Sequence, residues 1–120
     1  MPFNITADIT DELIESYLTE SEIAVDTELH GLRLFRDEVC LIQVCDGKNN
    51  VSLIRPENNL IPPNLKRLLT DSGIIKVFHF AITDVAFLYT SLNIKVEPFC
   101  CTKVMSKLIR TYTQDHGLKD

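Results

Sequence analysis

The most informative segment of this chain is Ile23-Ala24-Val25-Asp26-Thr27-Glu28, an apolar strand that runs directly into two acids. Residues i and i+2 of a strand face the same way, so the carboxylates of Asp26 and Glu28 are expected to project side by side. Two carboxylates that close repel each other unless a cation or a proton compensates their charge. Mg²⁺ and Mn²⁺ prefer oxygen ligands, so a divalent metal site is one interpretation of the pattern. The alternative is that the acids simply face solvent at the end of the strand.

A third acid follows a second apolar strand. The segment 73–80 (GIIKVFHF) has a strand composition that runs out near His79, and Asp84 then lies in the first turn of the next helix. The helix dipole alone favours an acid there, and His79 alone fits a hydrogen-bonded core histidine. Because groups at the ends of adjacent strands converge in an α/β sheet, Asp84 is also expected near Asp26 and Glu28. Three such carboxylates suit the two cations of two-metal phosphodiester hydrolysis.

The other elements follow from periodicity and turn residues. Apolar spacing predicts helices after Thr10, after Pro63, over 84–92 and over 104–109, and strands over 22–29, 39–46, 51–55, 73–80 and 94–99. The segment 30–38 is expected to be a turn or edge excursion. Three successive strands followed by alternating helices and strands predict a mixed β-sheet flanked by helices, an α/β fold in one domain over residues 1–120.

The composition excludes several protein classes. With 120 residues, 45% hydrophobic and 24% charged, the chain is too apolar to be disordered. Its apolar runs are too short to span a membrane, and its acidic N-terminal stretch does not resemble a signal peptide. We therefore expect a cytoplasmic protein with no membrane partner. The net charge of −5 argues, at first sight, against a nucleic-acid partner.

The charge is distributed unevenly. Residues 1–38 carry a net charge of −8 and residues 39–120 a net charge of +3. Four bases gather in and after the final predicted helix, namely Lys103, Lys107, Arg110 and Lys119. They form either a basic patch or an ordinary solvated helix face. Apolar residues on the same helix are expected to belong to the core, namely Met105, Leu108 and Ile109.

The four cysteines are Cys40, Cys45, Cys100 and Cys101. In a reducing compartment they are expected to be thiols. Cys40 and Cys45 lie an odd number of residues apart in one strand and should therefore point to opposite faces. The chain has no C-x-x-C spacing, so buried, apolar-like cysteines are favoured over a zinc site.

Four segments together resemble the ribonuclease D family: DTELHGL (26–32), RDEVCLIQVC (36–45), HFAITDVAFL (79–88) and CTKVMSKLIRTYTQDHGLKD (101–120). The similarity runs from about residue 20 onward and is closest to short, single-domain bacterial proteins of this kind. The resemblance implies a ribonuclease H-like fold and the activity of a 3′–5′ exoribonuclease of the DEDD superfamily.

The resemblance also implies roles for individual residues. Asp26 and Glu28 match the D-x-E of the first exonuclease motif, and Asp84 matches the acid of the second, H-x-A-x-x-D. These three are implied as catalytic residues that ligate two Mg²⁺ or Mn²⁺ ions. The implied substrate is the 3′ end of single-stranded RNA, with DNA as an alternative. Implied substrate-binding residues are Leu29, His30, Leu32, His79, Lys103, Lys107 and Arg110; for the first three, edge packing is an equal alternative.

The third motif of the family, Y-x-x-x-D, has no match in this chain. Tyr112 is followed four residues later by His116 rather than by aspartate. The chain is therefore expected to correspond to the first two thirds of the family domain, with the C-terminal part of the fold missing. We expect little or no nuclease activity from it alone, and self-association through the apolar surface left exposed. The alternative is a non-catalytic nucleic-acid-binding or protein-interaction module on the same fold.

Overall fold

A computed structural model describes residues 4–57, 60–111 and 113–118. Tyr112 and the predicted base Lys119 lie outside these residues. In chain order the elements are β1 (Ile5–Thr6), α1 (Asp11–Tyr17), β2 (Glu22–Leu29), β3 (Val39–Cys45), β4 (Val51–Ile54), α2 (Pro63–Leu69), β5 (Ile75–Phe78), α3 (Ala81–Leu92), β6 (Phe99–Cys101) and α4 (Thr102–Ile109). The predicted order is confirmed, and the two-residue strand β1 is added to it.

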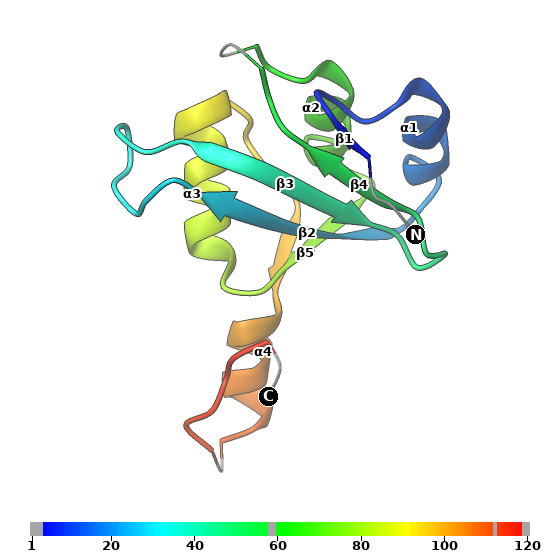
Figure 1. Ribbon diagram of the computed structural model, residues 1–120. Helices are drawn as coiled ribbons and strands as arrows, with labels where there is room; N and C mark the ends of the chain where they lie inside the picture. Colours follow the sequence, from blue (N-terminus) through cyan, green and yellow to red (C-terminus); the bar gives the residue numbers. More distant parts are fainter. Residues whose placement is uncertain (1–3, 58–59, 112, 119–120) are drawn as a thin grey trace.

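The strands form one mixed sheet in the order β1-β4-β3-β2-β5-β6 (Figure 1). β2, β3 and β4 make an antiparallel meander, whereas β1 pairs with β4, β5 with β2 and β6 with β5 in parallel. β2 therefore lies inside the sheet, between an antiparallel and a parallel neighbour. The fold is the mixed α/β sheet flanked by helices that the sequence predicts.

One face of the sheet packs against α1, α2 and α3. On β2, Ile23 and Val25 are buried and Ala24 and Asp26 are exposed, as the two-residue period of a strand requires. The buried side chains of the strands share one core with apolar residues of the three helices, among them Ile14, Tyr17, Leu65, Leu68, Leu69, Phe87 and Leu88. The opposite face of β2 carries Asp26.

The core also contains one lysine. Lys76 on β5 is fully buried, and its Nζ donates hydrogen bonds to the backbone carbonyls of Asp71 and Glu97. These carbonyls lie in the segments that precede β5 and β6, so one side chain ties both connections together. Burial lowers the pKa of Lys76 below its usual value.

The last strand lies further along the chain than the sequence predicts. The expected strand at 94–99 is replaced by β6, which begins at Phe99 and pairs with β5. Ile94 and Val96 alternate with exposed residues because their side chains enter the core, at 0% and 2% exposure, and not because their backbone joins the sheet. Alternation alone reports burial and does not report strand pairing.

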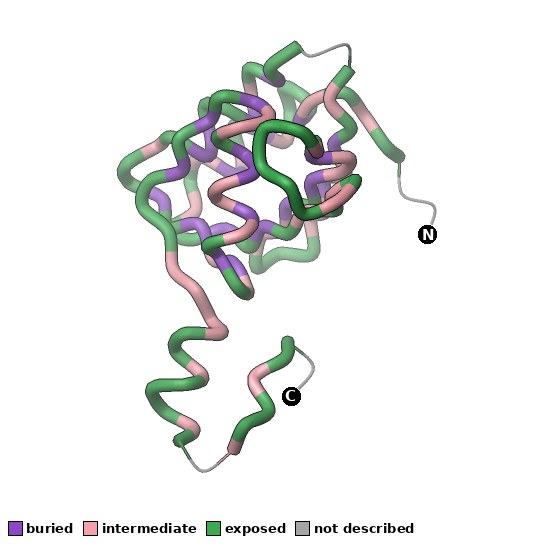
Figure 2. The backbone as a smooth tube through the Cα atoms, turned by 90° about the vertical axis from the view of Figure 1, so that its left-hand side faces the viewer, coloured by how far each residue is buried: buried purple, intermediate pink, exposed green. Residues whose placement is uncertain are grey.

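The chain after β6 projects from the rest of the molecule. We call α4 and the residues that follow it, 102–111 and 113–118, the arm, and residues 4–57 and 60–101 the body (Figures 1 and 2). No residue of α4 is buried. The expectation that Met105, Leu108 and Ile109 belong to the core is wrong, because they are 46%, 73% and 74% exposed. Their helical spacing marks an apolar stripe, but a stripe does not specify what covers it.

Two further expectations concern the state of the cysteines and the presence of a membrane-spanning helix. All four cysteines are free, as predicted, but each is partly exposed rather than buried. Among the described residues, no helix combines the length and the apolar character needed to cross a membrane.

Candidate active site

The two acids of the first motif lie on β2, in the middle of the sheet. Asp26 and Glu28 are both exposed and share the face that is turned away from α1, α2 and α3. In the register with β3, Asp26 lies opposite Gln43 and Glu28 opposite Leu41. Thr27, between the two acids, points to the other face. The side-by-side arrangement inferred from the spacing follows directly from the strand.

The third acid approaches the same strand from α3. Phe80 adopts a left-handed conformation (φ 61°), which ends the connection from β5, and α3 begins at Ala81, three residues earlier than predicted. Asp84 therefore still lies in the first turn, where it is only 8% exposed. Its Oδ1 accepts a hydrogen bond of 2.6 Å from the Thr27 hydroxyl. This bond connects the helix-borne acid to the strand that carries the other two.

The three acids are close enough for their charges to interact. Burial raises the pKa of Asp84, the negative charges of Asp26 and Glu28 raise it further, and the hydrogen bond from Thr27 opposes both effects. A divalent cation would relieve this uncompensated negative charge, and an all-carboxylate donor set suits Mg²⁺ or Mn²⁺. As the side chains stand, however, the described residues contain no group of three or more His, Cys, Asp or Glu arranged to hold a metal ion.

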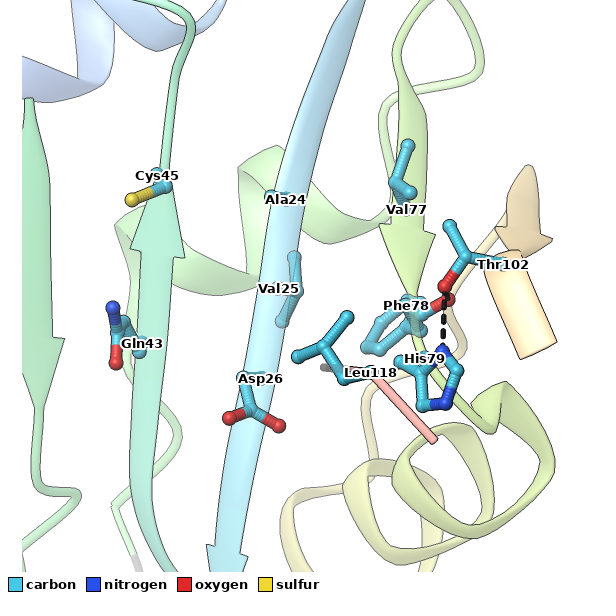
Figure 3. Close-up of a pocket in the computed structure, with 10 residues that line it drawn as sticks. All are labelled: Ala24, Val25, Asp26, Gln43, Cys45, Val77, Phe78, His79, Thr102 and Leu118. Atoms are coloured by element: carbon cyan, nitrogen blue, oxygen red, sulfur yellow. Dashed lines mark hydrogen bonds between the residues drawn. The ribbon is translucent and has the colours of Figure 1, made fainter. Parts of the chain in front are cut away.

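A pocket of about 250 Å³ opens beside Asp26 (Figure 3). Its lining comes from β2, β3, β5, the start of α4 and the end of the arm: Ala24, Val25, Asp26, Gln43, Cys45, Val77, Phe78, His79, Thr102 and Leu118. Asp26 provides the acidic side of this lining, and the rest is mainly apolar. The pocket thus places an apolar cavity directly next to a carboxylate of the first motif.

His79 borders this pocket with a defined orientation. The Thr102 hydroxyl donates its single hydrogen to the carbonyl of Phe78 (3.2 Å) and lies 2.8 Å from Nδ1 of His79. Nε2 is buried and has no hydrogen-bond partner within the described part of the chain.

The three residues predicted to contact the terminal nucleotide behave differently from one another. Leu29 is half-buried and packs against the core. The backbone N–H of His30 donates to the carbonyl of Glu38 (3.1 Å), and the residue is exposed. Leu32 is 79% exposed in the loop between β2 and β3. None of the three lines the pocket.

The predicted basic residues lie on the arm. Lys103 places its Nζ 4.3 Å from the centre of the Phe80 ring, which is a cation–π contact at the start of α3. Lys107 is exposed in the last turn of α4, and Arg110 is the residue at its C-terminal cap. The structure therefore brings Asp26, Glu28, Asp84 and His79 to one end of β2 and β5 and leaves the bases along the adjoining helix.

Several residues of the site were not predicted from the sequence. Thr27 and Gln43 could have been recognised, because Thr27 lies inside the D-x-E motif and strand pairing places Gln43 opposite Asp26. Thr102 and Leu118 reach the pocket only through the path of the chain after β6. No local pattern in the sequence reports that path.

The chain is similar in sequence to known exonucleases. A profile of a 3′–5′ exonuclease family matches residues 5–120. Ribonuclease D of Cronobacter turicensis is 30% identical over 104 residues, which are 87% of this chain and 28% of that protein. Exosome complex component 10 of Homo sapiens is 32% identical over 110 residues, which are 90% of this chain and 12% of the human protein.

The chain is also similar in fold to solved nuclease structures. NrnC of Brucella melitensis superposes with a TM-score of 0.89 at 37% identity, over 99% of this chain and 58% of that one. Other structures of NrnC contain bound Mg²⁺ or are bound to pGG. This chain spans less than a third of the length of the two curated relatives above. The family match covers nearly the whole chain. The chain therefore belongs to the 3′–5′ exonuclease family, as a homologue of ribonuclease D within the DEDD group.

Proposed function

We propose that the chain carries the metal site of a 3′–5′ exoribonuclease that hydrolyses single-stranded RNA from its 3′ end. The observation that carries the proposal is the pair Asp26 and Glu28 on β2 near the buried Asp84, which is hydrogen-bonded to Thr27 between them. Burial raises the pKa of Asp84, and the charges of Asp26 and Glu28 add to that rise. Such clustering of carboxylates is electrostatically unfavourable unless a cation compensates it. The Mg²⁺ and pGG bound to the relative NrnC support both the metal and a nucleotide substrate.

Asp26, Glu28 and Asp84 would hold two Mg²⁺ or Mn²⁺ ions. Bound there, such ions would activate the attacking water and stabilise the leaving 3′ oxygen. Asp84 is buried and hydrogen-bonded, so it supplies a fixed carboxylate, whereas Asp26 and Glu28 are exposed and free to turn toward it. Rotation of the two exposed side chains toward the fixed carboxylate of Asp84 would bring the three acids together around the metal.

The remaining residues would receive the RNA. The pocket beside Asp26 and His79 would take the terminal nucleotide, with the exposed His30 and Leu32 at the end of β2. The bases of α4, Lys103, Lys107 and Arg110, would contact phosphates further from the 3′ end. We propose the cytoplasm as the compartment, which agrees with four free cysteines.

Calorimetric titration with Mn²⁺ tests the metal site. The 120-residue chain should bind Mn²⁺, and Asp26→Asn should weaken binding at least about tenfold. Glu22→Gln is the matched control, because Glu22 is an exposed acid on the same face of the same strand. It should bind as the parent does. Equal affinity in the parent and in Asp26→Asn would overturn the proposal.

The activity of the 120-residue chain is expected to be low. The chain contains no Y-x-x-x-D, so one metal carboxylate and the residue that positions the water are not supplied by it. Loss of such groups commonly costs about 10²–10⁴-fold in rate. Digestion of 3′-labelled RNA by the 120-residue chain should therefore be slow. Rapid, Asp26-dependent digestion by the 120-residue chain would contradict this expectation.

A non-catalytic nucleic-acid-binding module is the second candidate. The absence of Y-x-x-x-D from the chain favours it. So does the fact that the described residues contain no group of three or more His, Cys, Asp or Glu arranged to hold a metal ion. The two candidates differ in their response to metal. RNA binding that is identical with and without Mn²⁺, and identical in Asp26→Asn, would favour the module.

A further inference from the structure

We propose that Thr27 is a positioning residue of the metal site, whose hydroxyl fixes the Asp84 carboxylate for metal binding. The inference rests on the proposed function, because it takes Asp26, Glu28 and Asp84 as metal ligands. It assigns a role to the residue between the two acids of the first motif.

The alternation of β2 separates Thr27 from its neighbours. Asp26 and Glu28 point to the open face of the sheet, and Thr27 points to the face on which α3 packs. A single strand therefore carries two ligands on one side and a hydroxyl on the other. That hydroxyl meets Asp84, which arrives on α3 from a segment 57 residues further along the chain.

The hydrogen bond leaves one carboxylate oxygen for a ligand. Thr27 donates to Oδ1 of Asp84 at 2.6 Å, which is in the short range typical of hydroxyl–carboxylate bonds. No donor among the described residues bonds to Oδ2. Since Asp84 is 8% exposed, its carboxylate also has little freedom to turn toward solvent. One oxygen is thus anchored, and the other makes no hydrogen bond within the described residues.

The side chain of threonine suits this task. Its β-branched carbon restricts rotation about χ1 in a strand, so the direction of the hydroxyl is set by the backbone of β2. The same backbone sets the positions of Asp26 and Glu28. Thr27 therefore couples the position of the helix-borne acid to that of the two strand-borne acids, which separate segments of the chain would otherwise fix independently.

Two substitutions at Thr27 test the role of the hydroxyl. Thr27→Val keeps the shape and removes the donor, and Thr27→Ser keeps the donor. We expect Thr27→Val to weaken Mn²⁺ binding by about 10- to 100-fold, as loss of a ligand-orienting group commonly does, and Thr27→Ser to restore most of the affinity. Thr70→Val is the control, because Thr70 also donates a hydrogen bond, to the Lys66 carbonyl, but lies at the end of α2.

A double-mutant cycle separates positioning from a general loss of stability. If Thr27 acts through Asp84, then Thr27→Val should have no further effect on Mn²⁺ affinity in an Asp84→Asn background. A purely structural bond between β2 and α3 would instead lower the urea midpoint of Thr27→Val while its folded form binds Mn²⁺ as the parent does. That result would overturn the inference and leave the metal site standing.

The outcomes for the two proposals are distinct. Mn²⁺ binding that depends on Asp26 and Asp84 but is equal in the parent and in Thr27→Val contradicts only the role of Thr27. Absence of Mn²⁺ binding by the parent contradicts both proposals. Weakening by Thr27→Val, recovery in Thr27→Ser and no effect of Thr70→Val support both.

Discussion

The body and the arm contain similar apolar residues but place them in opposite environments. Figure 2 shows that the buried residues gather in the body and that the arm is largely exposed. Leu68 on α2 is fully buried among the helices and the sheet, whereas Leu108 on α4 is 73% exposed. Both lie on amphipathic helices, so helical periodicity does not distinguish them. The difference is that α2 lies against a sheet face and another helix, while the apolar stripe of α4 stays largely exposed. Amphipathicity identifies a face that needs a partner, and only the fold shows whether it has one.

A matched pair of leucine substitutions should show the largest difference between the two regions. Leu68→Ala removes a fully buried side chain and should lower the free energy of unfolding by about 2–5 kcal/mol. Leu108→Ala should change it by less than about 0.5 kcal/mol, because the side chain is exposed. Urea unfolding of the two variants measures both values. An equal loss in Leu108→Ala would mean that the arm packs against the body in solution.

Lys76 allows a second test of the body. Lys76→Met should lower the free energy of unfolding by about 1–3 kcal/mol, because the buried carbonyls of Asp71 and Glu97 lose a charged donor. Lys66→Met, at an exposed position on α2, should be close to neutral. The same urea experiment compares them. If Lys76→Met were as stable as the parent, the lysine would not tie the two connections together.

The exposed stripe of the arm should drive self-association. Clustered apolar side chains in water favour contact between copies, so sedimentation should show concentration-dependent association of the parent chain. Leu108→Lys should reduce it. Leu32→Lys, at an equally exposed leucine of the body, should leave it unchanged. Association that persists in Leu108→Lys would place the contact elsewhere.

The smallest expected effect concerns the bases of the arm. Lys107→Ala should weaken binding of a single-stranded RNA a few-fold and lower the slope of log affinity against log salt by about 0.7, the value for one phosphate contact. Lys66→Ala, on the body, should do neither. Fluorescence anisotropy at several salt concentrations measures both quantities. An unchanged slope in Lys107→Ala would remove α4 from the RNA-binding surface.

The sheet and its acids could be predicted because local rules determine them. The two-residue period of a strand separates Ile23 and Val25 from Asp26, and the acids of β2 follow from that alternation. The position of Asp84 in the first turn of α3 was predicted, although the helix begins at Ala81. Each of these features is determined by residues within a single segment of the chain.

The remaining features depend on contacts between distant segments. The two-residue strand β1 is too short to leave a period in the sequence, and the alternation of Ile94 and Val96 reports burial rather than pairing. The exposure of Leu108 depends on what lies beside α4. The bond between Thr27 and Asp84 joins residues 57 positions apart. No local sequence pattern predicts any of these features.

A crystal structure determined with Mn²⁺, and read by anomalous scattering, tests the metal site most directly. We predict anomalous density bounded by the carboxylates of Asp26, Glu28 and Asp84, with the Thr27 hydroxyl still bonded to Oδ1 of Asp84. The exposed side chains of Asp26 and Glu28 should turn toward the metal while Asp84 keeps its position. Anomalous density only elsewhere on the chain, or none at saturating Mn²⁺, would contradict the assignment of these acids as metal ligands.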